Sequence, residues 1–231
     1  MTTGQLSSKH SSKVLLIMNT NQTRTQRTRT ASRQRREQEK EELRQTILAA
    51  AAALFLEHGY EAFSLRQVAE QIGYSPTTIY LHFEDKDSLL FAVVDQAYDR
   101  FTRNLQAAYD STGDPQQRLR ALAEAYIAFG RQNPAAYQTI FMQRPDFLLK
   151  WKAGAKQPRA TSLLILKQAV QQAQEAGAIT GGNVDTLSDV LWAAVHGAVS
   201  LAISMPQLFG DNLDASFAAV LDAALKGISP G

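Results

Sequence analysis

The stretch from Ser64 to Phe83 constrains the fold of this chain most, because it reads as two short helices joined by a tight turn. Ser64 followed three residues later by Gln67 has the form of a capping box, which predicts that a helix begins at Ser64. Gly73 predicts the end of that helix, since glycine adopts the left-handed conformation without a Cβ clash. An apolar stripe spaced i, i+3, i+4 and i+7 is expected to face a neighbouring helix. Its members are Leu65, Val68, Ala69 and Ile72.

A second helix is predicted directly after the turn. Ser75 can cap it, and Pro76 suits the first helical position, where no backbone N–H is needed. Ile79 and Phe83 are four residues apart and are expected to hold the helix to a core. Two helices around a short glycine-containing turn form a helix-turn-helix, whose second helix can enter the major groove of DNA. The polar side chains available for phosphates or base edges are Thr77, Thr78, Tyr80 and His82.

The motif and its flanks resemble the DNA-binding domain of TetR-family transcriptional regulators. The resemblance covers about a fifth of the chain and is specific, because the segments occur as an ordered, nearly continuous set. The matching segments are the leading helix ILAAAAALFLEHGY (Ile47 to Tyr60), the helix SLRQVAEQIG, the recognition helix SPTTIYLHF (residues 75–83) and EDKDSLL (Glu84 to Leu90), which opens the next helix.

The resemblance implies DNA contacts for individual residues. Thr77 and Thr78 are the candidates for base edges, and Arg66 is a candidate for a base or a phosphate. Lys86 matches a position that commonly contacts phosphate, and the alternative is a solvated lysine. The remaining DNA-binding candidates, mainly for phosphates, are Ser64, Ser75, Tyr80 and His82.

Composition favours a globular protein that is not an enzyme. The chain has 231 residues and no cysteine, which excludes a disulfide framework, a thiolate zinc site and a cysteine nucleophile. No H-E-x-x-H, G-x-S-x-G or phosphate-loop motif occurs. We therefore predict no catalytic residue, no metal site and no cofactor. The four histidines are scattered, at His10, His58, His82 and His196.

Charge is distributed unevenly. Residues 1–36 contain eight Lys or Arg and no acidic residue, whereas the rest of the chain has more acidic than basic residues and the net charge is only +2. We predict that residues 1–37 form a disordered basic arm. Such an arm either raises DNA affinity in a salt-dependent way or is a solvated tail with little effect. Its apolar run from Val14 to Met18 is too short for a signal peptide or membrane span, so we expect a cytoplasmic protein without a membrane partner. Met18 is an alternative to Met1 as the residue at which translation starts.

The remaining pattern predicts an all-α protein, because every periodic stretch has helical spacing and none alternates as a strand would. We assign residues 38–88 to a three-helix helix-turn-helix domain and residues 89–231 to a C-terminal helical domain for effector binding and dimerisation. Helices are expected to start at Asp85, Asp114, Asn133, Thr161, Asn183 or Asp185, and Asp214, with the second of them ending near Gly130.

The last two long helices are apolar over more than one face, which implies burial against a surface outside their own domain. A four-helix bundle across a two-fold axis supplies such a surface, and TetR-like regulators dimerise in this way. We therefore predict a homodimer. The alternative is a large monomeric core.

The C-terminal domain holds many of the aromatic residues, which could frame an apolar ligand pocket or simply pack the core. The run W-A-A-V-H-G at residues 192–197 resembles the Trp-His-Gly signature of one group of TetR C-terminal domains. Charged candidates for an anionic ligand are Arg131, Arg144, Lys150 and Lys152, which no pattern places in one site. The candidate ligand-binding residues are Tyr126, Phe129, Tyr137, Phe141, Trp192 and His196.

Taken with the resemblance, these features predict a homodimeric, ligand-responsive repressor. Its recognition helix, residues 75–83, would bind a palindromic operator, and a small hydrophobic effector would release it. Two alternatives stay open. One is a DNA-binding protein of the same fold that acts through a protein partner without an effector, and the other is an activator.

Overall fold

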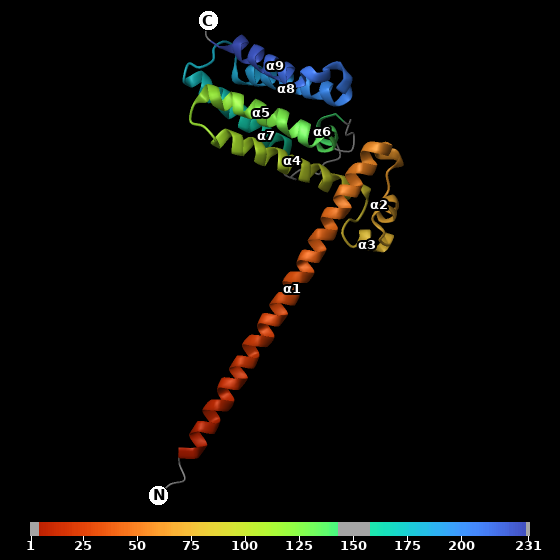
Figure 1. Ribbon diagram of the computed structural model, residues 1–231, viewed down its shortest axis with the longest axis vertical. Helices are drawn as coiled ribbons and strands as arrows, with labels where there is room; N and C mark the ends of the chain where they lie inside the picture. The colour runs from red at the N-terminus through yellow and green to blue at the C-terminus, as the bar shows by residue number, and fades with distance from the viewer. Residues whose placement is uncertain (1–4, 143–157, 230–231) are drawn as a thin grey trace. The chain divides into compact units, whose positions relative to one another are not determined.

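The computed structural model describes the backbone of residues 5–142 and 158–229, and side chains from residue 29 to 142 and from 161 to 229, Asp211 excepted. Within these ranges every regular element is a helix, which confirms the predicted all-α class (Figure 1). The chain divides into two compact units, residues 1–47 and 48–231. The elements are α1 (Gln5–Ala62), α2 (Leu65–Ile72), α3 (Pro76–Tyr80), α4 (Lys86–Asp110), α5 (Pro115–Gln132), α6 (Pro134–Tyr137), the π-helical turn η1 (Gln138–Met142), α7 (Pro158–Glu175), α8 (Val184–Ser204), the 3₁₀ turns η3 (Pro206–Leu208) and η4 (Gly210–Asn212), and α9 (Leu213–Ile228).

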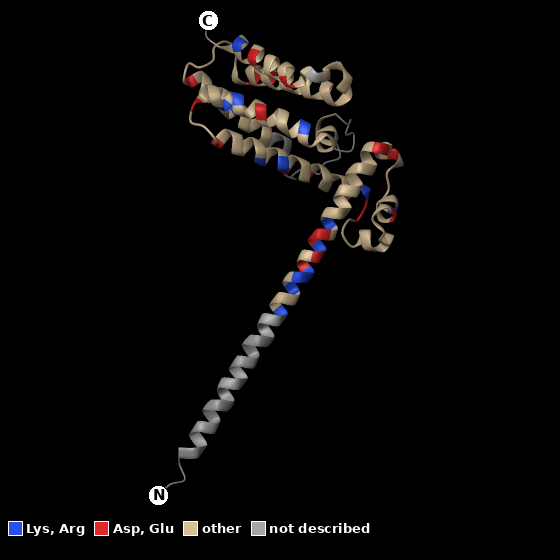
Figure 2. Cartoon of the chain, viewed as in Figure 1, with Lys and Arg blue, Asp and Glu red and all other residues tan. Residues whose placement is uncertain are grey.

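Helix α1 differs from the predicted disordered arm over residues 1–37, because its backbone is helical from Gln5. No Gly or Pro occurs between residues 5 and 58, so nothing in the sequence breaks the helix strongly. A helix that is polar all round can be supported by ion pairs between residues four apart, and Figure 2 shows basic and acidic residues interspersed along the described part of α1. Two such pairs, both 2.9 Å between Nε and Oε1, are Arg33 to Glu37 and Arg35 to Glu39.

The caps of the helix-turn-helix confirm both predicted helix starts. The Ser64 hydroxyl accepts the N–H of Gln67 at 3.3 Å, and the Ser75 hydroxyl accepts the N–H of Thr78 at 3.2 Å. Gly73 ends α2 in the left-handed conformation, with φ 72° and ψ 27°. The predicted capping box differs in one detail: the Ser64 hydroxyl donates to Gln67 Oε1 at 2.8 Å, so the second bond joins two side chains.

The core of this motif agrees with the sequence pattern at Ile79 and Phe83. Ile79 and Phe83 are buried, with 0% and 6% of their surface exposed, and Phe63, just before α2, is buried as well. Gly59, with φ 72°, interrupts the helical conformation of α1. Tyr60, which precedes Phe63 by three residues, is only half-buried.

The helices of the C-terminal domain pack around α5. Helix α4 packs against α5 and α7, and α8 packs against α5, α7 and α9 (Figure 1). The predicted start of α4 is confirmed by a capping box, in which Asp85 accepts the N–H of Ser88 at 2.7 Å and Ser88 Oγ accepts the N–H of Asp85 at 3.1 Å. The buried stripe of α4 includes Leu89, Val93 and Phe101, as its spacing predicts.

Gly130 allows close contact between α5 and α8. The sequence placed a helix end near this glycine, but α5 continues to Gln132 and Gly130 is buried inside it. A Cβ atom at this position would lie 2.3 Å from Val199 Cγ1 and 3.2 Å from Tyr137 Cδ2. Packing of α5 against α8 therefore requires a residue without a side chain at position 130. Gly130 does not mark the end of the helix.

Among the described residues, one helix combines the length and apolar composition that a membrane span requires. This helix is α8, whose most apolar 18-residue window has a mean hydropathy of 1.4 and is 33% buried within the chain. Length and composition do not distinguish a membrane span from a helix that packs in a protein core. The low buried share of that window, together with the exposed side chains of Val190 and Leu201, shows that the described residues leave part of the apolar surface of α8 uncovered.

Candidate nucleic-acid interface and ligand cavity

Helix α3 presents some of its predicted DNA-binding side chains more fully than others. Tyr80 is 59% exposed, and Thr77 is also exposed. Thr78 is half-buried, and its hydroxyl lies 2.9 Å from the hydroxyl of Ser75, which also caps the helix. Thr77 and Tyr80 are consequently the side chains of α3 best placed to meet an external partner.

The candidates on α2 differ in the same way. The Ser64 hydroxyl caps α2: it accepts a hydrogen bond from the backbone N–H of Gln67 and donates one to the Gln67 side chain. Arg66 is exposed, and its Nε lies 3.8 Å from Glu70 Oε1, a weak surface pair. His82, after α3, is half-buried.

Lys86 is held by a contact that local sequence patterns did not predict. Its Nζ donates to the backbone carbonyl of Tyr60 at 3.1 Å and lies 4.1 Å from the centre of the Tyr60 ring. The Tyr60 hydroxyl donates to the carboxylate of Asp87, and this bond is the main reason why the pKa of Tyr60 rises to about 12. These three residues tie the segment after Gly59 to the first turn of α4. Residues 26 positions apart form this cluster, so helical spacing gives no sign of it.

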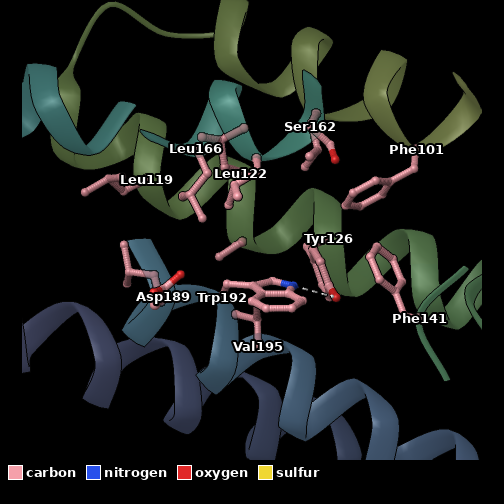
Figure 3. A pocket seen from close by; sticks show the side chains of 14 residues that line it. Phe101, Leu119, Leu122, Tyr126, Phe141, Ser162, Leu166, Asp189, Trp192 and Val195 are labelled. Carbon is pink, nitrogen blue, oxygen red and sulfur yellow. Dashed lines mark hydrogen bonds between the residues drawn. The ribbon is translucent and has the colours of Figure 1, made fainter. Parts of the chain in front are cut away.

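A cavity of about 90 Å³ lies between α4, α5, α7 and α8 (Figure 3). Its wall is aliphatic and aromatic, with Ser162 and Asp189 as the polar exceptions. Asp189 is exposed and is the one charged side chain among the described lining residues. The principal apolar lining residues are Phe101, Leu105, Leu119, Leu122, Tyr126, Phe141, Leu163, Leu166, Leu191, Trp192 and Val195.

The six predicted ligand-binding residues fall into two sets. Tyr126, Phe141 and Trp192 line the cavity. The rings of Phe129 and Tyr137 are buried away from its wall, with 0% of their surface exposed. His196 is half-buried and does not line the cavity either. The sequence thus predicted the residues of the aromatic cluster. It did not predict which rings face the cavity and which pack behind its wall.

Comparison with known proteins identifies both halves of the chain. Residues 47–93 match the family described as "Bacterial regulatory proteins, tetR family", and residues 119–224 match "Tetracyclin repressor-like, C-terminal domain". The chain belongs to the TetR family. Members of this family are regulatory proteins, so the prediction that the chain is not an enzyme is confirmed. The second match includes the Trp192 to Gly197 run.

Three relatives illustrate the similarity of this TetR-family protein to known ones. The HTH-type transcriptional activator FasR of Mycolicibacterium smegmatis is 32% identical over 120 residues, or 52% of this chain and 54% of the relative, so the match spans about half of each protein. A Rhodococcus sp. RHA1 protein of unknown function is 27% identical, with 81% of this chain and 96% of that chain covered and a TM-score of 0.65. The regulator PfmR of Thermus thermophilus is 26% identical, with 80% and 96% covered and a TM-score of 0.62.

Behind the cavity wall, this TetR-family protein has a polar network. The Tyr137 hydroxyl lies 2.7 Å from His196 Nδ1, and the Tyr126 hydroxyl lies 3.0 Å from the same nitrogen. Trp192 Nε1 donates to the Tyr126 hydroxyl at 3.2 Å (Figure 3). Ser200 Oγ lies 3.4 Å from His196 Nε2. The network joins α5, α6 and α8, and its polar groups bond mainly to one another.

The two tyrosines of this network are neutral at physiological pH, as an ordinary phenol is, and burial disfavours their ionised form further. It raises the pKa of Tyr126 far above its ordinary value, with a further contribution from the neighbouring Tyr137. Burial also raises the pKa of Tyr137. Both phenols therefore retain their protons at physiological pH, and the aromatic end of the cavity carries no negative charge from them.

The charged candidates from the sequence do not form a described anion site. Arg131 Nη1 lies 2.5 Å from Asp214 Oδ1 on the surface and is not among the lining residues of the cavity. Arg144, Lys150 and Lys152 lie outside the described residues. Within the described part of the chain, no group of three or more His, Cys, Asp or Glu side chains is placed to hold a metal ion.

Proposed function

We propose that this chain is a homodimeric transcriptional repressor, which binds a palindromic operator through α3 and leaves it when a small hydrophobic effector enters the C-terminal cavity. One observation carries the proposal: a single TetR-family chain combines a capped recognition helix with exposed polar side chains and an apolar cavity among helices. In a homodimer, the two recognition helices would lie about 34–36 Å apart and would match successive major grooves on one face of DNA. The protein acts in the cytoplasm, where its operator lies.

The exposed face of α3 supports base and phosphate contacts in this proposal. Thr77 is the first candidate for a base edge, because it is exposed, whereas the hydroxyl of Thr78 is shared with Ser75. Tyr80 is the first candidate for a phosphate, because its 59% exposed ring ends in a hydroxyl donor. Arg66 adds a positive charge from the exposed side of α2.

The described part of α1 offers a second surface for DNA phosphates. Arg29, Arg33, Arg36 and Lys40 share one surface hollow of the helix, together with Ser32 and Glu37. The i, i+4, i+7, i+11 spacing of the four cations places them on one face. A row of cations attracts the DNA backbone without reading its sequence, so this surface would raise affinity in a salt-dependent way. The proposed arm is thus a helical one.

The exposed side of α8 supports a dimer. Val190 and Leu201 are 45% and 42% exposed, and they are the large apolar side chains that this helix leaves on the surface. A Cβ on Gly197 would meet nothing within 4 Å among the described residues, so this position leaves room for a closely packed neighbour. Helix α9 packs beside α8 and carries the exposed residue Ala219. A second copy would cover this apolar surface in a four-helix interface.

The cavity supports a small, uncharged and largely apolar effector. Its wall offers few polar groups, and the nearby tyrosine and histidine groups bond to one another. Helix α4 links the cavity to the DNA reader, because Phe101 and Leu105 line the cavity while Lys86 at its start is bound to Tyr60. A ligand that favours a different placement of α4 would shift the population away from the operator-binding spacing.

Activation is a second candidate, favoured by one finding. The relative that is 32% identical over 120 residues is named a transcriptional activator. The same dimer, operator and effector would serve an activator, and transcription from the operator-bearing promoter with and without the protein distinguishes the two directions.

The DNA surface is tested by Tyr80→Phe, which removes one hydroxyl from an exposed ring. We expect weaker binding to an operator duplex in fluorescence anisotropy at fixed salt, with an unchanged melting temperature. Undiminished affinity would remove Tyr80 from the interface.

The cavity is tested by isothermal titration calorimetry with benzene, a neutral apolar ligand about the size of the phenyl ring that would fill a cavity of about 90 Å³. We expect saturable binding to the wild-type protein and loss of binding in Ala123→Phe, since Ala123 lines the cavity and a phenyl ring would fill it. No saturable signal with the wild type would contradict an accessible apolar site.

A further inference from the structure

Leu81, directly after α3, is the most exposed large apolar side chain among the described residues. Its surface is 77% exposed, compared with 59% for Tyr80 and 49% for Tyr74. The residue is fixed in position by the helix, because its N–H bonds to the carbonyl of Thr77 at 3.2 Å and its backbone is right-handed helical, with φ −70° and ψ −19°. An apolar side chain is thus held at a defined place on the DNA-reading element while making little contact with the core.

Packing of the motif does not account for this leucine. Ile79 and Phe83 are the buried anchors of the segment, and Leu81 lies between them in sequence with its side chain outside. Residues three and four apart are neighbours on a helix surface, so Leu81 shares a face with Thr77. Tyr80, its neighbour in sequence, is exposed as well. Two hydrogen-bonding side chains and one apolar side chain therefore form the exposed end of α3.

We propose that Leu81 is a specificity-determining residue that reads a thymine by contact with its C5-methyl group in the major groove. Leucine has no side-chain donor or acceptor, so it cannot distinguish bases by hydrogen bonds. Thymine is the only base that presents a methyl group in the major groove. Burying that methyl against the leucine removes apolar surface of both groups from water, whereas a cytosine at the same place presents its polar amino group. The inference rests on the proposed operator binding through α3.

The same geometry predicts the form of the specificity. Thr77 or Tyr80 contributes hydrogen bonds, and Leu81 adds a preference for an A·T pair with the thymine facing it at one position of each half-site. In a palindrome this position occurs twice, once for each protomer. Replacing the leucine with alanine should relax selection at this position and leave the other positions unchanged.

The first experiment selects binding sites from a random duplex library with three full-length proteins: wild type, Leu81→Ala and Leu164→Ala. Leu164 is the matched control, because it is also an exposed leucine, 62% exposed, but lies on α7. We expect one thymine position to be fixed in the sites of the wild type and of Leu164→Ala and to be relaxed in those of Leu81→Ala. Equal melting temperatures of the three proteins establish that the fold is retained.

The second experiment removes only the methyl group, by replacing that thymine with deoxyuridine in the selected operator. We expect the wild type to lose about fourfold in affinity for each thymine replaced, the effect of about one buried methyl group, and Leu81→Ala to lose nothing further. An unchanged site preference of Leu81→Ala, or equal deoxyuridine effects on both proteins, would overturn the inference and indicate another partner for the leucine. If the wild type selects no sequence at all, the proposed operator binding itself fails, and this inference fails with it.

Discussion

Gly130→Ala should destabilise the protein, although alanine normally stabilises a helix. Replacing a helical glycine with alanine gains about 0.5–1 kcal/mol when the new methyl meets no obstacle. At Gly130 the methyl carbon would lie 2.3 Å from Val199 Cγ1, whereas carbon atoms pack at about 3.5–4.0 Å. The overlap is therefore more than about 1 Å, and it involves a β-branched side chain with little rotamer freedom in a helix.

The size of the effect follows from these opposing contributions. Overpacking of a well-filled core costs about 1–3 kcal/mol, and an overlap this large belongs at the upper end of that range. After subtraction of the helical gain of alanine, we expect a net loss of about 1–2 kcal/mol in the free energy of unfolding. For a chain of this length, that loss lowers the melting temperature by about 2–8 °C.

The assay is urea denaturation and thermal melting of Gly130→Ala, Val199→Ala and the double variant. Removing the Val199 methyl groups makes room for the new methyl at position 130, so the double variant should be more stable than the sum of the two single losses by at least about 1 kcal/mol. Gly227→Ala is the matched control, because a Cβ at that helical glycine meets no described residue within 4 Å. A Gly130→Ala variant as stable as the wild type, or more stable, would refute the close packing of α5 against α8.

Three further predictions concern the remaining contacts. Tyr60→Phe should lower the free energy of unfolding near neutral pH, because it removes the hydrogen bond from the Tyr60 hydroxyl to Asp87. We expect a loss of only about 1 kcal/mol, since this half-buried bond is partly screened by solvent. Since the folded pKa is about 12 and the ordinary value is 10.0, this stabilisation is present below pH 10 and is lost as the pH rises through 12, which denaturation at several pH values measures. Leu201→Glu should give a monomer at micromolar concentration in sedimentation experiments while the exposed control Leu164→Glu stays dimeric; a dimeric Leu201→Glu variant would remove this part of α8 from the interface. Replacing Arg29 and Arg36 with Gln should reduce the slope of log affinity against log salt by up to about two for each protomer, and an unchanged slope would exclude α1 from the phosphate contacts.

Local signals predicted the helix-turn-helix well, because caps and turns depend on residues only a few positions apart. Ser64, Ser75 and Asp85 each cap the helix that the sequence assigned to them, and Gly73 has the left-handed conformation that its position indicated. The burial of Ile79 follows from the same short-range spacing. These features also define the candidate DNA surface, which is why its location was predictable.

Contacts between distant residues were not predictable in this way. The binding of Lys86 to Tyr60 depends on the path of the chain between α1 and α4. As a result, the ammonium group of Lys86, which the sequence predicted to contact a DNA phosphate, lies over the ring of Tyr60. Gly130 was predicted to lie near a helix end. Its actual role is to leave room for Val199, and the sequence does not show that these two residues are in contact. Low apolar content suggested disorder before residue 38, although pairs such as Arg33 with Glu37 support a helix there.

The cavity illustrates the same limit. Aromatic content indicated a cluster in the C-terminal domain, and the structure places Tyr126, Tyr137 and His196 in one hydrogen-bonded network. Which rings line the cavity depends on how α5, α6 and α8 pack, and this is set by close contacts such as the one at Gly130. The sequence therefore predicted the residue set, while three-dimensional packing divides it into lining and supporting residues.

Specific recognition of an operator can be measured by fluorescence anisotropy with two duplexes of equal length, the DNA upstream of the gene for this protein and a scrambled control, each over a series of salt concentrations. We expect tight binding to the native duplex at physiological salt, whereas the scrambled duplex should dissociate under the same conditions. Equal and steeply salt-sensitive binding to both duplexes would contradict specific recognition at this site, because it would mean that only the phosphate contacts of the basic surface are at work.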